Sequence, residues 1–289
     1  MTITLLLENN PLAFTITCLV LGLLIGSFLN VVIHRLPIML EQEWKAEYAR
    51  AGAETPPSVE KFNLAVPRSR CPHCGHAITA LENIPLLSYA ALRGRCSACH
   101  ARISPRYVVV EAVCGLLSAW AAWHFGFGWQ ALGALILTWG LLALSGIDLE
   151  TQLLPDRLIL PLLWLGLLFN LGHVFTDIDS AVIGAAAGYL TLWAVYHLFR
   201  LATGKEGMGY GDFKLLALLG AWFGWQRLPV VIIMAAGVGA VVGLLLLGSK
   251  LLKRGAPMPF GPFLAAAGWL VLYWGTPLTD AYLGFTGVH

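Results

Sequence analysis

The amino-acid sequence predicts an all-α polytopic membrane protein with about eight transmembrane helices and a small zinc-stapled cytoplasmic domain between the first two. Hydrophobic residues make up 58% of its 289 residues and charged residues only 12%, about half the charged fraction of an average soluble domain. The mean hydropathy is +0.73. This composition excludes disordered, fibrous and disulfide-rich secreted proteins, and it argues against an ordinary cytosolic enzyme. The formal net charge of +2 gives no indication of a nucleic-acid partner.

Apolar stretches define the predicted spans, because a helix needs about 20 mostly apolar residues to cross a bilayer. One shorter stretch, 213–225, suits a buried or tilted segment by its length alone, so seven or eight spans are predicted. We do not expect the first stretch to be a cleaved signal peptide, since residues 1–11 contain no Lys or Arg and the apolar run is too long. The other stretches are 12–33, 107–127, 130–147, 158–174, 181–201, 228–247 and 259–274.

The distribution of basic residues predicts the orientation. Ten of the 18 Lys and Arg residues lie between Arg35 and Arg106. If that segment is cytoplasmic and there are eight spans, only Arg227 faces the other side, as the positive-inside rule requires. Seven spans would place the last basic cluster outside, so eight are preferred, with both termini outside. The other residues at predicted cytoplasmic ends are Arg157, Arg200, Lys205, Lys214, Lys250, Lys253 and Arg254.

Three regions follow from this topology. Residues 1–35 are predicted to form the first transmembrane helix, 36–106 a cytoplasmic zinc-binding domain, and 107–289 a seven-helix transmembrane domain. A polar segment of about 70 residues is marginal for an independent core, and domains of this size often depend on a metal.

Two CxxC pairs lie in that polar segment. Cys71 and Cys74 are followed, after 21 residues, by Cys96 and Cys99, and the two halves resemble each other at an offset of 25. Paired turns of this kind direct four thiolates to one tetrahedral Zn²⁺, and four protein ligands leave no open position, so the predicted zinc is structural. Two reducible disulfides are the alternative, but a cytoplasmic location disfavours them.

The remaining Cys residues and the His residues beside the CxxC pairs are predicted to have structural roles. His73 and His100 could replace a cysteine ligand, although solvated turn positions are the preferred interpretation. Cys18 and Cys114 lie inside spans and are predicted to be small core residues. Gly22 and Gly26 form a GxxxG pattern that predicts close helix packing.

Four acidic residues lie in or beside the spans, where ionisable groups are costly and point to function. Asp148 ends an apolar run, at a helix end whose dipole disfavours a carboxylate, so capping does not explain it; a frayed, solvated end is the alternative. Asp212 follows a glycine-rich turn and could instead be a helix N-cap. Asp156 is interpreted as a cap or loop residue, and Glu111 could reach the interface or pair with another span.

The topology places Asp148 and Asp212 at the cytoplasmic ends of two different spans. Two carboxylates that meet in a partly desolvated site cannot both ionise easily and would share a proton. Such a pair suits activation of water by one member and protonation of a carbonyl by the other. The sequence makes this meeting possible without showing it.

Two other classes of function remain open from the residues alone. A multi-span transporter would use Glu111, Asp148 and Asp212 to relay protons or bind a cation, but it should carry these groups near the midplane of repeated halves, and no convincing repeat is found. A membrane scaffold would use the zinc module to bind a partner and would not need the aspartates.

The chain resembles the bifunctional prepilin peptidases, also called type IV leader peptidases, a group of GxGD intramembrane aspartyl proteases. The resemblance covers nearly the whole chain. It rests on GSFLNVVIHRLP at 26–37, the two CxxC pairs, Asp148 with LPD at 154–156, and MGYGDFKL at 208–215.

This resemblance implies a bacterial inner-membrane enzyme whose partners are prepilins, pseudopilins of type II secretion and the lipid bilayer, with no nucleic acid. Asp148 and Asp212 match the catalytic pair that removes a basic leader after a glycine. The resemblance also implies methylation of the new N-terminal amine by S-adenosyl-methionine. Gly94 matches a glycine linked to that transfer, although it could be an ordinary turn residue of the zinc knuckle. The sequence contains no Rossmann-type G-x-G-x-x-G motif for the cofactor.

Overall fold

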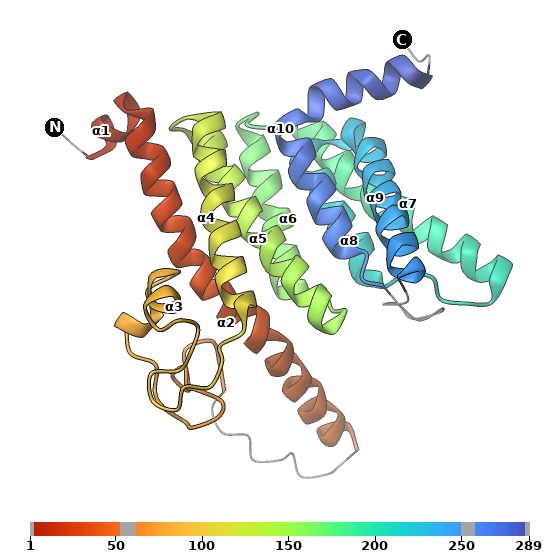
Figure 1. Ribbon diagram of the computed structural model, residues 1–289. Helices are drawn as coiled ribbons and strands as arrows, with labels where there is room; N and C mark the ends of the chain where they lie inside the picture. Colours follow the sequence, from red (N-terminus) through yellow and green to blue (C-terminus); the bar gives the residue numbers. More distant parts are fainter. Residues whose placement is uncertain (1–2, 53–61, 250–257, 287–289) are drawn as a thin grey trace. The chain divides into compact units, whose positions relative to one another are not determined.

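The computed structural model describes residues 3–52, 62–249 and 258–286 and is nearly all helical (Figure 1). Each predicted apolar stretch coincides largely with one helix, and no strand forms within the described ranges. The predicted fold class is therefore confirmed. Residues Met1–Phe127 and Gly128–His289 form two compact units.

In the first unit, two long helices pack side by side (Figure 1). The short helix α1 (Ile3–Asn9) precedes α2 (Pro11–Ala51), and α4 (Pro105–Phe125) is the partner of α2. Helix α2 has 41 residues and continues without a break past residue 35. At 1.5 Å per residue it is about 60 Å long, roughly twice the thickness of a bilayer core.

Small residues allow α2 and α4 to approach each other closely. A Cβ atom on Gly22 would lie 2.8 Å from the carbonyl oxygen of Cys114, and one on Gly26 would lie 2.8 Å from the Cα of Glu111. The packing role predicted for this GxxxG pattern is confirmed. Near the start of α4, the amide of Asn30 donates a hydrogen bond of 3.0 Å to the carbonyl of Tyr107.

The described part of the segment between these helices, residues 62–104, carries little regular structure. It contains the 3₁₀ turn η1 (Leu81–Asn83) and the short helix α3 (Leu87–Ala91). Arg35 of α2 is only 9% exposed and anchors the start of the segment, because its guanidinium donates to the carbonyl of Asn63 at 3.0 Å.

In the second unit, helix α8 (Tyr210–Phe223) is the most enclosed element, with 11 of its 14 residues buried. Its Gly220 meets Gly184 of α7 (Ile178–Thr203) so closely that neither position can carry a side chain without displacing the other helix. This burial explains how so short a helix is stable inside the unit. The remaining helices are α5 (Trp129–Thr151), α6 (Asp156–Leu171), α9 (Leu228–Gly248) after the 3₁₀ turn η2 (Trp225–Arg227), and α10 (Gly261–Thr286).

Among the described residues, five helical segments are long and apolar enough to cross a membrane: α2, α4, α5, α7 and Trp225–Gly248. Helices α6 and α8 have 16 and 14 residues, fewer than the roughly 20 that span a bilayer. The eight-span count therefore stays a prediction. The basic residues Lys250, Lys253 and Arg254, on which that count depends, lie outside the described ranges.

Candidate functional site

Asp148 lies in the last turn of α5 and is only 4% exposed. The helix continues to Thr151 and ends at Gln152, a left-handed residue whose N–H donates to the carbonyl of Asp148 at 2.9 Å. The alternative of a frayed helix end with a solvated carboxylate is therefore wrong.

The start of α10 holds the Asp148 carboxylate. The N–H of Gly261, the first residue of α10, donates a hydrogen bond of 3.0 Å to Asp148 Oδ2. A Cβ atom on Gly261 would lie 2.6 Å from the same oxygen. Only glycine brings the backbone this close to the carboxylate without a displacement.

Asp212 is 6% exposed and is the third residue of α8. The N-cap of the helix is Gly209, so the interpretation of Asp212 as the N-cap is wrong. Its carboxylate instead accepts a hydrogen bond from the backbone of Gly209, as the third residue of a capping box does.

The structure brings Asp148 and Asp212 together in the second unit. The two carboxylates interact electrostatically, although 63 positions separate them along the chain. The side chain of Leu154 packs against both helix starts: Cβ atoms on Gly211 and Gly261 would lie 2.6 Å and 3.3 Å from its Cβ and Cδ1 atoms. The two buried acids therefore lie in the last turn of α5 and the first turn of α8, and the start of α10 contacts Asp148.

Asp156 and Lys214 form a separate ion pair beside this site. Lys214 Nζ lies 2.7 Å from both carboxylate oxygens of Asp156, and the two side chains are 32% and 50% exposed. Asp156 is the first residue of α6 and Pro155 is the N-cap, so Asp156 is neither the N-cap nor a loop residue but a helical residue with a cationic partner. Glu111 belongs to the first unit, where its carboxylate is hydrogen-bonded to Leu86 and Ser27.

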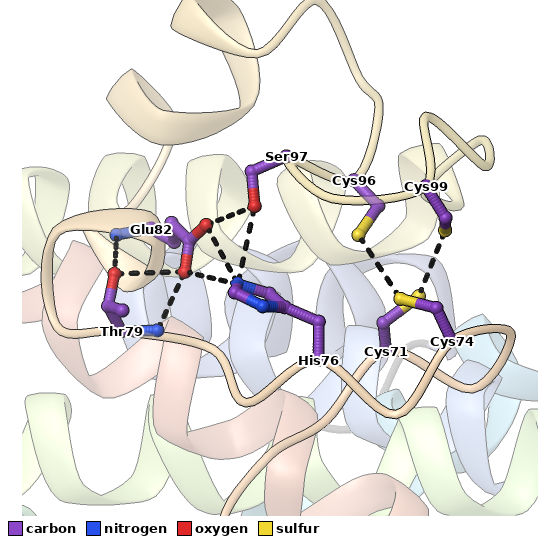
Figure 2. A network of polar contacts seen from close by, with 8 residues as sticks. All are labelled: Cys71, Cys74, His76, Thr79, Glu82, Cys96, Ser97 and Cys99. Atoms are coloured by element: carbon purple, nitrogen blue, oxygen red, sulfur yellow. Dashed lines mark hydrogen bonds and ion pairs between the residues drawn. The ribbon is translucent and has the colours of Figure 1, made fainter.

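The four cysteines of the CxxC pairs form one cluster in the first unit. Their sulfur atoms all lie within 4.8 Å of one another, and the Cys71–Cys99 and Cys74–Cys96 pairs are 3.8 Å and 3.9 Å apart (Figure 2). Thiolates at 2.3 Å from one tetrahedral Zn²⁺ would be about 3.8 Å apart, so this arrangement fits the ion.

The structure also decides among the alternatives for the other Cys and His residues. All six cysteines are free, so the disulfide alternative is wrong. Neither His73 nor His100 belongs to the group of possible metal ligands found among the described residues. Cys18 and Cys114 are 3% and 0% exposed, as predicted for core residues.

The two cysteine turns are structural repeats at the offset of 25 seen in the sequence. Isolated antiparallel bridges join Arg70 to Ala77 and Arg95 to Arg102. In each turn the first cysteine donates its N–H to the residue five positions later, at 2.9 Å. The pKa of Cys71 is lowered to about 7 by backbone N–H groups, first that of Cys74, and the pKa of Cys96 is lowered in the same way by Cys99.

A polar network that the sequence analysis missed joins the two cysteine turns (Figure 2). Glu82 accepts from the N–H of Thr79 at 2.8 Å and from the hydroxyls of Thr79 and Ser97, and it lies 3.2 Å from Nε2 of His76. The hydroxyl of Ser97 first, and then the Thr79 groups, hold the pKa of Glu82 down at about 2. The capping-box spacing Thr-x-x-Glu at 79–82 was the signal that could have found it.

This network is not a catalytic triad. Ser97 lies 3.3 Å from Nε2 of His76, the same ring nitrogen that meets Glu82. A triad needs the nucleophile and the acid on opposite nitrogens of the imidazole. The network therefore fastens the turns to each other.

Gly94 lies where the chain turns into the second cysteine pair. Its φ is +68°, and a Cβ atom there would lie 2.8 Å from the ring of Tyr89. The equivalent residue of the first turn, 25 positions earlier, is Ser69, which has no positive φ. The left-handed backbone and the close approach of Tyr89 both favour glycine here, as the turn interpretation predicts, and the link of Gly94 to methyl transfer stays a prediction.

Two family models match the chain, one within each of its two compact units. A model of the bacterial peptidase A24 N-terminal domain matches residues 20–125, and a model of the type IV leader peptidase family matches residues 135–244. Proteins named prepilin leader peptidase/N-methyltransferase are 60% identical in Stutzerimonas stutzeri (96% of this chain, 97% of that one) and 57% identical in Pseudomonas aeruginosa (97% of each). A third, from Aeromonas hydrophila, is 58% identical over 91% of each chain. No solved structure matches the chain.

Proposed function

Because the chain belongs to the type IV leader peptidase family, we propose that it removes the basic leader of type IV prepilins and type II secretion pseudopilins after a glycine. It then methylates the new N-terminal residue. The observation that supports the peptidase half is the electrostatic interaction between two buried carboxylates, Asp148 and Asp212.

The proposed peptidase mechanism is direct attack of water on the scissile carbonyl. One carboxylate takes a proton from the water as its oxygen bonds the carbonyl carbon, while the other, protonated, donates to the carbonyl oxygen. The tetrahedral intermediate then collapses: the C–N bond breaks, the leaving amine takes a proton from the pair, and no covalent bond to the enzyme forms. The pair shares one proton and titrates as a unit, so the base role belongs to the pair. The Gly261 N–H fixes the orientation of Asp148 throughout.

The proposed methyltransferase half involves the first unit. S-adenosyl-methionine would supply a methyl group to the amine that cleavage frees, and the amine would give up one proton. Gly94 is the residue that we link to this transfer. Zn²⁺ would be held by Cys71, Cys74, Cys96 and Cys99 and would be structural, because four thiolates complete its tetrahedral shell.

The proposed location is the bacterial inner membrane, with several passes and with the zinc segment and the aspartates on the cytoplasmic side. The five apolar helical segments support an integral membrane protein. The cluster of basic residues between Arg35 and Arg106 supports the orientation.

The decisive experiment is cleavage of a purified prepilin in detergent by the wild type, Asp148→Asn and Asp212→Asn. Asn keeps the size and polarity of Asp but cannot cycle a proton. Asp179→Asn is the matched control, because Asp179 is an exposed residue in the first turn of α7. We expect cleavage after the leader glycine by the wild type and the control, and none by folded Asp148 and Asp212 variants. Normal cleavage by either variant would move the catalytic assignment elsewhere.

A further inference from the structure

Glu111 is a buried carboxylate to which the proposed reactions give no chemical role. It lies in α4 and is only 9% exposed. An ionisable group within an apolar helix is costly and is retained where it has a partner or a function. Its contacts therefore need a separate explanation.

The carboxylate of Glu111 joins three segments of the first unit. Its Oε2 accepts a hydrogen bond of 3.0 Å from the N–H of Leu86, in the turn before α3. The Ser27 side chain of α2 is also hydrogen-bonded to it. Gly26 has no side chain, so at this level α2 can lie directly against the backbone of Glu111. The acid thus connects α2, α4 and the turn.

The turn that Glu111 holds is strained. Leu86 combines a φ of +59° with a ψ of −45°, a backbone conformation that non-glycine residues rarely adopt. Such a conformation persists only where its surroundings fix it. The hydrogen bond that Leu86 donates to Glu111 fixes the Leu86 backbone, since without it a partly buried N–H would lose its acceptor.

The strained turn leads directly to Gly94. Helix α3 begins at Leu87, and Tyr89 on this helix is the residue whose ring occupies the space beside Gly94. The N–H of Gly94 bonds the carbonyl of Tyr89 at 2.9 Å, and the carbonyl of Gly94 accepts from Ile103 at 2.8 Å. A shift at Leu86 is therefore transmitted through one short helix to Gly94.

We infer that Glu111 is a positioning residue for methyl transfer, which acts by holding the Leu86 turn and, through Tyr89, the backbone at Gly94. The inference rests on the proposed methyltransferase function. It assigns Glu111 no part in cleavage, because the hydrogen bonds of its carboxylate go to Leu86 and Ser27.

The test compares full-length, zinc-loaded wild type with Glu111→Leu, which removes the acceptor, and Glu111→Gln, which keeps an oxygen that can accept from Leu86. Ser118→Ala is the matched control, because Ser118 is a buried polar residue of the same helix whose hydroxyl bonds Cys114 within α4. Four quantities are measured: prepilin cleavage, methylation of a precleaved pilin, bound zinc, and hydrogen exchange of the Leu86 amide.

We expect Glu111→Leu to methylate at least about tenfold more slowly, with faster exchange at Leu86, while cleavage and bound zinc stay within about twofold of wild type. Glu111→Gln should recover most of the methylation, and Ser118→Ala should behave as wild type. Unchanged methylation in Glu111→Leu would overturn the inference. Joint loss of methylation, cleavage and zinc would also overturn it, because Glu111 would then stabilise the protein in general. If the wild type itself fails to methylate, the proposed function fails, and the exchange at Leu86 still reports whether the contact exists.

Discussion

The backbone N–H of Gly261 and the carboxylate of Asp148 are 3.0 Å apart, although 112 residues separate them along the chain. The contact joins the start of α10 to the last turn of α5. It leaves no room for a side chain at position 261, because a Cβ atom there would lie 2.6 Å from Asp148 Oδ2.

Gly261→Ala should lower prepilin cleavage by about 100-fold, because misplacing a catalytic group by about 1 Å costs that much. Gly237→Ala in α9 is the control, since a Cβ atom there meets nothing within 4 Å. Cleavage rates of the two purified variants check the prediction. Equal rates would mean that Asp148 adjusts to the new methyl group without loss of geometry.

Asp156→Asn should keep cleavage within about threefold of wild type. The Asp156–Lys214 pair is half-exposed, and such pairs contribute about 0–1 kcal/mol to stability. Thermal unfolding and cleavage measured together check this prediction. A loss as large as that of Asp148→Asn would place Asp156 in the catalytic machinery instead.

Gly94→Ala should abolish most of the methylation and spare cleavage. The substitution imposes both a left-handed non-glycine residue and a collision with Tyr89. Gly75→Ala is the matched control, because Gly75 also has a positive φ, +73°, but a Cβ atom there meets nothing within 4 Å. Backbone strain alone costs about 1–2 kcal/mol, so the control should bind zinc slightly more weakly and still methylate. If both variants lose methylation equally, strain rather than Tyr89 explains Gly94.

Removal of zinc by a chelator should unfold the cysteine turns and impair methylation before cleavage. Glu82→Ala should make zinc release faster, since it deletes the acceptor that joins Ser97 to Thr79. The release rate is followed with a chromogenic chelator in wild type and variant. A folded segment with intact methylation after complete removal of the metal would contradict the assignment of structural zinc.

The Glu82 contacts should persist at every pH at which the enzyme is assayed. The pKa of Glu82 is about 2 in the folded protein, below the ordinary value of about 4.3. A carboxyl with a lowered pKa stabilises the fold above its ordinary pKa, and this stabilisation is lost as the pH falls through about 2. Zinc release from wild type and Glu82→Ala should therefore differ by a constant factor between pH 6 and 8. A difference that disappears within this range would contradict the prediction.

The sequence by itself determined the helices, the cysteine site and the two acids. Long apolar runs and CxxC spacing are local patterns, and the repeat at an offset of 25 is visible in the letters and again in the bridges Arg70–Ala77 and Arg95–Arg102. Residues near in sequence are constrained by backbone geometry alone, so such features can be predicted without a fold.

Only the tertiary structure decided which distant groups meet. The bond from Gly261 to Asp148 and the contact of Glu111 with Leu86 depend on how the chain packs, because no local period relates their positions. The same packing explains why α8 is stable with only 14 residues: its neighbours bury its apolar surface and, at Gly184 and Gly220, leave no space for side chains.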